Sequence, residues 1–273
     1  MNRSLKKNHL QSQVISINLN NLNTLNNEDI INQIDLKKLD KNNDGFVSNI
    51  DFNCTIDSLN RRYSTMEKVG EYLASLFPKN GKVLTQCFGE TIIGMMLRAA
   101  RKANNNVTIF CAETRPYLQG ARLTSSCCFD MGFETYVITD NMVAYAMKEK
   151  GIDLFTSAAD TIARDGHIAN KIGTLANYFN IPYYVTGIPD VDKKSVKDIV
   201  IEERDPSLVL QYRGIKNTLD GVKAFYPSFD ITPPDLIKGI VTDKGIYEAK
   251  KVNDYFNEPS SKDQIEVNQK EKG

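Results

Sequence analysis

Residues 82–112 read KVLTQCFGETIIGMMLRAARKANNNVTIFCA and decide the fold. Val83 and Leu84 form a short apolar run, Thr91–Ala103 has the apolar spacing of a helix, and Val107–Phe110 is apolar again. Short unbroken apolar runs are typical of strands that are buried on both faces of a parallel sheet. The stretch therefore predicts a strand, a crossover helix and a second, parallel strand.

The same alternation continues to residue 185. It predicts further strands at 135–138, 154–155 and 183–185, and further helices at 121–130, 142–148 and 168–179. Strands that alternate with helices at this spacing form an α/β fold with a doubly wound, mostly parallel, Rossmann-like sheet. A helix over 56–77 precedes the sheet, and Thr232-Pro233-Pro234-Asp235 predicts the start of another helix after it.

The N-terminal region has a different composition. Residues 1–60 are rich in asparagine and poor in aromatic side chains. Because asparagine competes for backbone hydrogen bonds, we expect disorder over 1–27 and a short helical N-terminal region over 28–80. The α/β catalytic domain then occupies 81–256, and a charged tail that should fray occupies 257–273.

The overall composition argues against several classes of partner. Basic and acidic side chains both number 34, so the formal net charge is zero, whereas a nucleic-acid surface needs a basic excess. No apolar run approaches the ~20 residues of a membrane span, and the first residues lack the apolar stretch of a signal peptide. The five cysteines show no C-x-x-C spacing, which argues against a disulfide framework and a structural zinc site. We expect a cytoplasmic protein.

A calcium-type loop is the one candidate metal site. Residues 40–51 read DKNNDGFVSNID, with oxygen-bearing side chains at alternate positions and a glycine at the sixth. The candidate ligands are Asp40, Asn42, Asp44, Phe46 and Asp51. The aspartate at the twelfth position is shorter than the usual glutamate, and such loops usually occur in pairs. A solvated turn between helices is the alternative interpretation.

Polar clusters follow four of the predicted strands. They lie at 85–87, 113–116, 139–141 and 157–160. Because the carboxyl ends of parallel strands meet at one edge of a sheet, reactive side chains collect in the crevice beyond that edge. We therefore expect an active site there, with one thiol, Cys87, and one carboxylate, Asp160.

Cys87 is the cysteine whose position favours reactivity. It precedes a predicted helix, and the positive end of the helix dipole lowers the pKa of a nearby thiol. A buried, inert thiol is the alternative. We adopt that alternative for Cys54, Cys111, Cys127 and Cys128.

Asp160 ends a run of apolar and small residues, 154–159. Desolvation raises the pKa of a carboxyl group, and an acid that holds its proton near neutral pH can deliver it to a substrate. The alternative is a helix cap for residues 161–163.

Other polar residues could bind a phosphorylated ligand. Asn170 and Lys171 lie near the start of the predicted helix 168–179, where backbone N–H groups and a cation can hold a phosphate, although a solvated lysine is the default. Arg115 either binds a ligand or pairs with Glu113 to fix a loop. No Gly-x-Gly-x-x-Gly or phosphate-loop lysine motif is present, so no nucleotide cofactor is indicated.

Four longer strings carry a resemblance to a known family. They are ETRPYLQGARLT at 113–124, ITDNM at 138–142, SAADTIARDGHIANKIGT at 157–174 and FDITPPDLI at 229–237. Together they resemble the sugar-phosphate isomerase family that includes methylthioribose-1-phosphate isomerase. That family is related to the alpha, beta and delta subunits of translation initiation factor 2B. The resemblance extends over residues 60–250.

The resemblance implies an aldose–ketose isomerase that converts a C5-modified ribose 1-phosphate into the ribulose 1-phosphate. Cys87 and Asp160 take the positions of the catalytic pair, and Gln119, Asn170 and Lys171 take those of substrate contacts. The chemistry suits Asp160 as the proton donor and shuttle. The family also implies a small phosphorylated sugar as ligand, a homodimer and no redox cofactor.

Arg115 and Asn141 complete the candidate substrate-binding residues, since each follows a predicted strand inside one of the resembling strings.

Several segments depart from the family pattern. Neither its Arg-Gly-Ala nor its Arg-Pro-Thr phosphate segment occurs before Cys87, where the local sequence is Gln-Cys-Phe instead of His-Cys-Asn. Asp160 is followed by threonine instead of arginine. The C5 substituent, methylthio or the hydrogen of 5-deoxyribose, therefore stays open. A regulatory subunit that binds a phosphorylated ligand without turnover is the alternative function.

Overall fold

The structure is a computed structural model that describes residues 49–171 and 180–258. The chain divides into two compact units, 1–65 and 66–273. The predicted disorder over 1–27, the calcium-loop positions 40–48 and the tail from 259 onward lie outside the described residues. The predicted domain boundaries stay predictions.

The described elements agree with most of the predicted ones. The described α-helices are α3 (Asn49–Ser75), α4 (Glu90–Lys102), α5 (Ser125–Asp130) and α6 (Val143–Glu149). A π-helical turn, η2 (Gly120–Thr124), precedes α5, and 3-10 turns are η3 (Asp140–Met142), η5 (Val196–Asp198), η6 (Pro206–Leu208), η7 (Pro234–Leu236) and η8 (Ala249–Phe256). The strands are β1 (Lys82–Thr85), β2 (Thr108–Ala112), β3 (Thr135–Ile138), β4 (Leu154–Ala158), β5 (Thr161–Ile162), β6 (Ile168–Asn170), β7 (Tyr183–Thr186), β8 (Gln211–Tyr212), β9 (Ile215–Lys216), β10 (Asp230–Thr232), β11 (Gly239–Val241) and β12 (Ile246–Tyr247).

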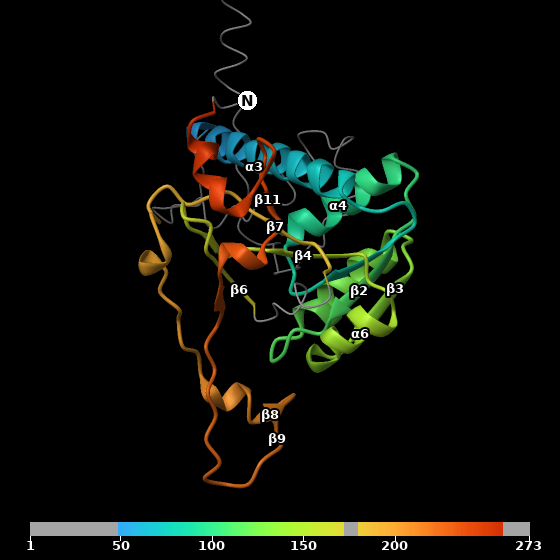
Figure 1. The fold of residues 1–273 in the computed structure, drawn as a ribbon. Helices are drawn as coiled ribbons and strands as arrows, with labels where there is room; N and C mark the ends of the chain where they lie inside the picture. Colours follow the sequence, from blue (N-terminus) through green and yellow to red (C-terminus); the bar gives the residue numbers. More distant parts are fainter. Residues whose placement is uncertain (1–48, 172–179, 259–273) are drawn as a thin grey trace, which may run out of the picture. The chain divides into compact units, whose positions relative to one another are not determined.

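The described residues form a seven-stranded main sheet (Figure 1). Its order is β12-β11-β7-β4-β1-β2-β3, and every neighbouring pair is parallel except β11 with β12. The predicted doubly wound, mostly parallel fold is confirmed. Because β1 has β2 on one side and β4 on the other, the chain changes its winding direction there. The carboxyl ends of β1 and β4 therefore flank the switch point at which doubly wound sheets bind ligands.

Both faces of the sheet are buried at its central strands, which explains the unbroken apolar runs there. Val83 packs in one apolar cluster with α4 and with Leu73 of α3, while its neighbour Leu84 packs in a second cluster with Met147 of α6. Figure 1 shows α4 and α6 on opposite faces of the strands. Alternate residues of one strand thus enter different cores, so neither face can be polar.

The predicted helix 168–179 is wrong in its first turn. Residues Ile168–Asn170 form β6, which pairs antiparallel with β5 and with β10. A hairpin turn connects β5 with β6, and Gly166 adopts a left-handed φ of 88° in that turn. Asn170 and Lys171 therefore come from the end of a strand, and the alternative of a helix cap at Asp160 is also wrong because β5 follows it. Residues 172–179 lie outside the described part of the chain.

The predicted helix at Thr232 is reduced to the single turn η7. Thr232 is buried as the last residue of β10, so its side chain does not cap a helix, and the residue before the turn is Pro233. Ile237 is already extended, with φ −110° and ψ 120°. The chain leaves the turn at once because it must enter β11.

We expect Gly120→Ala to destabilise the fold strongly. A Cβ at Gly120 would lie 1.7 Å from the carbonyl oxygen of Ala112, the last residue of β2. Overlap with backbone cannot be relieved by a rotamer change, so unfolding should become easier by about 3 kcal/mol or more. Denaturant titration of the purified variant measures this difference.

Gly151→Ala is the matched control. Gly151 has a left-handed φ of 61°, but nothing lies within 4 Å of an added Cβ. Its substitution should cost only the strain of that conformation, about 1 kcal/mol. Equal losses in the two variants would contradict the close approach at Gly120.

Candidate active site

Cys87 lies in a strained turn after β1, at the switch point of the sheet. Its φ is 59°, a left-handed conformation that is costly for a side chain other than glycine. The backbone N–H of Cys87 donates to Thr114 Oγ1 at 2.8 Å, and its carbonyl accepts a hydrogen bond from the hydroxyl of Thr124. The two threonines hold the thiol in a conformation that the turn alone would not favour.

Asp140 supports this arrangement from the next strand end. Its two carboxylate oxygens accept the backbone N–H groups of Thr114 and Arg115, each at 2.7 Å. Thr114 itself has a left-handed φ of 61°. The Asp140 carboxylate, after β3, thus fixes the turn after β2. Thr114 of that turn then holds Cys87 after β1.

Burial of Cys87 outweighs the interactions that lower its pKa. Desolvation raises the pKa of the thiol, and the charge of Asp160 raises it further, against the lowering effects of the Phe88 backbone and of Lys171. The prediction of a lowered pKa is therefore wrong. Desolvation is the largest of these causes, so the net shift of the thiol pKa is upward. The pKa of the Cys87 thiol therefore lies above its ordinary value.

Asp160 follows β4, the strand adjacent to β1. Its backbone N–H donates to the carbonyl of Ala169 at 3.0 Å, which fixes the turn, while its side chain stays accessible. Desolvation by the surrounding protein raises the pKa of the carboxyl group, and the charges of Lys171 and Arg204 oppose that rise. The predicted direction of the shift is confirmed.

Lys171 links the thiol and the carboxyl group electrostatically. Its pKa is lowered by burial, and the charges of both Cys87 and Asp160 act on it in the opposite direction. The Lys171 ammonium donates to the carbonyl of Ser228 at 3.0 Å and lies 4.2 Å from the centroid of the Phe229 ring. The structure therefore brings Cys87, Asp160 and Lys171 into one cluster.

Asn170 lies behind Lys171 in a buried polar network. Its amide donates to the hydroxyl groups of Ser157 and Tyr183, and those two hydroxyls are 2.6 Å apart. Its side-chain oxygen accepts the N–H of Lys171 at 2.7 Å. Both donor hydrogens of the amide are thus used within the protein, so Asn170 positions Lys171.

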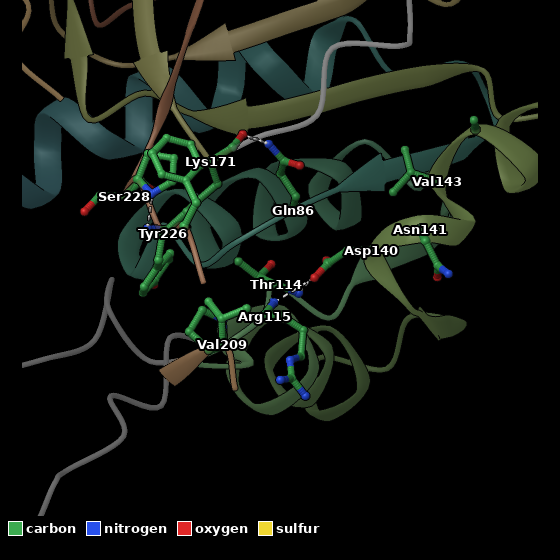
Figure 2. A pocket seen from close by; sticks show the side chains of 14 residues that line it. Gln86, Thr114, Arg115, Asp140, Asn141, Val143, Lys171, Val209, Tyr226 and Ser228 are labelled. Carbon is green, nitrogen blue, oxygen red and sulfur yellow. Dashed lines mark hydrogen bonds between the residues drawn. The ribbon is translucent and has the colours of Figure 1, made fainter. Parts of the chain in front are cut away.

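A cavity of about 530 Å³ opens beside this cluster. Figure 2 shows Lys171, Ser228 and Tyr226 on one side of it and Asn141 and Val143 on the other. Its lining consists of Gln86, Thr114, Arg115, Pro116, Asp140, Asn141, Val143, Ala144, Lys171, Val209, Phe225, Tyr226, Pro227 and Ser228. Cys87 and Asp160 are not in this lining, but the residue before Cys87 and the cation that interacts with Asp160 both are.

The remaining predicted residues differ in how they meet the cavity. Arg115 lines it, but its guanidinium donates to the Gln211 carbonyl at 3.2 Å and lies 5.3 Å from the Tyr212 ring centroid. Asn141 lines it and accepts a hydrogen bond from the Thr139 hydroxyl at 2.6 Å.

Gln119 stands apart from this lining. Its side-chain oxygen is buried, and no described residue donates a hydrogen bond to it.

Sequence reasoning missed several residues of the site. Asp140 was available in the string ITDNM, but only the structure shows that its oxygens bind backbone N–H groups. Tyr226 and Ser228 lie just before the string FDITPPDLI, and their closeness to it could have indicated them. Arg204 belongs to the charged run IEERD, which is typical of a solvated surface.

The described residues give no further support for a metal site. Within 49–171 and 180–258, no group of three or more His, Cys, Asp or Glu side chains could hold a metal ion. Of the predicted calcium ligands, Asp51 falls within α3, and the other four lie outside the described residues. None of the described helices combines the length and the apolar composition needed to cross a bilayer.

Comparison with known proteins decides the family. The sequence model of the Initiation factor 2 subunit family matches residues 10–249. This chain belongs to that family. The resemblance inferred from the four strings is thereby confirmed.

Two curated relatives illustrate the similarity of this chain to proteins of known name. A methylthioribose-1-phosphate isomerase of Desulforamulus reducens is 40% identical over 204 residues, which are 68% of this chain and 58% of that protein. One of Bacillus pumilus is 40% identical over 199 residues, 67% of this chain and 56% of that protein. The chain thus spans less than two thirds of the length of these relatives.

Solved structures show the same fold. A 5-methylthioribose 1-phosphate isomerase of Pyrococcus horikoshii OT3 is 30% identical with a TM-score of 0.68, covering 82% of this chain and 68% of that one. The delta subunit of translation initiation factor eIF-2B from A. fulgidus is 32% identical with a TM-score of 0.62, covering 67% of this chain and 58% of that one.

Proposed function

We propose that this chain is an aldose–ketose isomerase that converts 5-methylthioribose 1-phosphate into 5-methylthioribulose 1-phosphate. The observation that carries the proposal is the cluster of Cys87, Asp160 and Lys171 at the switch point of the sheet. Two weak acids with raised pKa values, next to a cation, suit proton transfer on an anionic sugar. Relatives that are 40% identical are named for this activity.

In this reaction Asp160 donates one proton and later accepts one back. The protonated carboxyl group of Asp160 gives its proton to the ring oxygen, and the bond between C1 and that oxygen breaks. Hydrogen then moves from C2 to C1, by a proton or a hydride route, and the C2 hydroxyl returns its proton to the Asp160 carboxylate. The C2 carbonyl forms, and Asp160 is again ready to act as an acid.

Cys87 serves this reaction through its side chain. Cys87 follows β1 and Asp160 follows the adjacent strand β4, so the first two carbons of the sugar would be held between the two residues. In a hydride route the thiol stabilises the charge that develops at these carbons. A proton route would need the thiolate, which takes the proton from C2 and, as the thiol so formed, gives it to C1.

The substrate is tested by phosphorus NMR. The purified protein is incubated with 5-methylthioribose 1-phosphate and, separately, with 5-deoxyribose 1-phosphate. We expect the resonance of the methylthio sugar to be replaced by that of its ketose phosphate. Conversion of the deoxy sugar alone would assign the other C5 substituent, and conversion of neither would refute the isomerase.

A regulatory subunit is the second candidate function. It is favoured by the 32% identity with the A. fulgidus eIF-2B delta subunit. Such a protein would bind the same sugar phosphate in the cavity without turnover, a result that calorimetry combined with NMR would reveal. A homodimer, a cytoplasmic location and the absence of a required cofactor stay predictions.

The pH dependence of turnover should reflect the pKa of Asp160. Because ring opening needs the protonated carboxyl group, kcat should be constant at low pH and fall as the pH rises through that pKa. The charges that act on Asp160 come from Lys171, after β6, and from Arg204. Lys171→Gln removes a positive charge that lowers the pKa of Asp160, so that pKa should rise. The decline of kcat should therefore move to higher pH.

This shift is measured as kcat at saturating substrate across the pH range. Lys148→Gln, which removes an exposed charge from α6, is the control and should leave the profile unchanged. A profile of Lys171→Gln that stays in place or moves to lower pH would contradict the role of Asp160 as the acid.

A further inference from the structure

Residues 202–204 pair antiparallel with residues 226–228, which places Arg204 beside the wall of the cavity. Ser228 N–H donates to the Glu202 carbonyl at 2.8 Å, and Arg204 N–H donates to the Tyr226 carbonyl at 3.0 Å. Glu203 and Pro227 form the bridge between these bonds. Since Tyr226, Pro227 and Ser228 line the cavity, the pairing ties the backbone of Arg204 to that wall.

The side chain of Arg204 approaches the same aromatic ring as Lys171. Its guanidinium carbon lies 5.9 Å from the centroid of the Phe229 ring, and the Lys171 ammonium lies 4.2 Å from it. The guanidinium is also 5.7 Å from the centroid of the Tyr117 ring. Two cations from distant parts of the sequence thus meet around one ring.

Among the described residues, no buried ion pair neutralises these two cations. Glu202 lies 3.7 Å from the Arg204 guanidinium, but its side chain is 68% exposed, so water screens the interaction. The Arg204 charge lowers the pKa of Lys171, which is the mark of two cations held close to each other. Both cations also act on Asp160. An arrangement of this kind favours a bound anion.

A buried polar group lies at the cavity wall. Ser228 is buried and lines the cavity beside Lys171, as Figure 2 shows, and its hydroxyl has no partner among the described residues. The Lys171 ammonium is already held by the backbone carbonyl of the same residue. The Lys171 ammonium is therefore held in place at the cavity wall before a ligand binds.

We propose that Arg204 and Lys171 together bind the phosphate group of the sugar phosphate. The planar guanidinium can contact two phosphate oxygens at once, and the ammonium adds a second charge. A phosphate held there lies close to Asp160, on which both cations act, so C1 of the sugar is brought to the acid. This inference rests on the proposed function for the identity of the sugar. It also supplies phosphate-binding groups in a chain that lacks the Arg-Gly-Ala segment.

Steady-state kinetics of Arg204→Gln test the proposal. We expect KM for 5-methylthioribose 1-phosphate to rise by about 10- to 100-fold, as loss of a charge-assisted contact requires, while kcat changes only a few-fold. Arg204→Lys keeps the charge but loses the two-oxygen geometry, so its KM should be intermediate. Arg213→Gln, which removes an exposed arginine between β8 and β9, is the control and should behave as the wild type.

Binding measurements separate this proposal from the isomerase itself. Calorimetry compares 5-methylthioribose 1-phosphate with unphosphorylated 5-methylthioribose. Arg204→Gln should lose affinity for the phosphorylated sugar only. Wild-type binding without turnover would refute the isomerase and leave the phosphate site supported if Arg204→Gln weakens that binding.

Three results would overturn the phosphate site. One is an unchanged KM and affinity in Arg204→Gln. Another is an equal loss of affinity for both sugars, which would indicate general damage to the cavity. The third applies if Arg204→Gln does not fold. Arg204→Lys is then measured instead, and a wild-type KM and affinity in Arg204→Lys would overturn the phosphate site.

Discussion

Asp160→Asn should lower kcat for 5-methylthioribose 1-phosphate by about 10³-fold or more, because loss of a positioned general acid removes this order of rate acceleration. Asparagine has nearly the shape of aspartate but cannot give its proton to the ring oxygen. The turn itself is fixed by the hydrogen bond from the Asp160 backbone to Ala169, which the substitution leaves intact. We therefore expect a folded protein with KM within a few-fold of the wild-type value.

Phosphorus NMR assays of turnover and calorimetry of binding measure the two effects separately. Asp192→Asn is the control, since Asp192 is an exposed carboxylate in the turn after β7, and it should keep the wild-type kcat. A purified Asp160→Asn protein with wild-type turnover would show that another group delivers the proton.

Cys87→Ser should lower kcat by about 10²-fold, in line with the loss of one well-placed proton-transfer or stabilising group. The serine hydroxyl is smaller and less polarisable than the thiol, and it releases its proton far less readily. The N–H and carbonyl of residue 87 keep their bonds to Thr114 and Thr124, so the turn should persist. KM should change little, because Lys171 still binds the substrate.

Cys127→Ser is the matched control. Cys127 is a half-buried thiol of α5, and desolvation raises its pKa to about 12. Its loss should not affect kcat. Equal kcat values for Cys87→Ser and the wild type would remove Cys87 from the chemistry and leave Asp160 as the single reactive group.

The sheet and the position of the site could be predicted because both depend on local patterns. Val83 and Leu84 enter different cores, so the strand had to be apolar at both positions, and such runs are visible in sequence. Polar residues that end these runs must lie at one edge of the sheet. Cys87 and Asp160 followed from that rule together with the family resemblance.

The hairpin at β6 could not be predicted in the same way. Ile168–Asn170 is too short for its apolar spacing to distinguish a strand from a helix. What makes it a strand is its pairing with β10, which lies some 60 positions later in the sequence.

The chemistry of the site depends on tertiary contacts that sequence does not reveal. The helix after Cys87 suggested a lowered thiol pKa, whereas burial raises it. Arg204 belongs to a charged run, and only its pairing with Tyr226 brings it to the cavity wall. Asp140 appears in sequence as one more polar residue, yet it holds the turn that carries Thr114.

A crystal structure of Asp160→Asn with bound 5-methylthioribose 1-phosphate tests the central claim most directly. We predict that the substituted side chain at position 160 lies within hydrogen-bonding distance of the ring oxygen, that the sulfur of Cys87 contacts C1 or C2, and that the phosphate lies between Lys171 and Arg204. A sugar bound in this cavity with neither residue 160 nor Cys87 touching its reacting atoms would contradict the account.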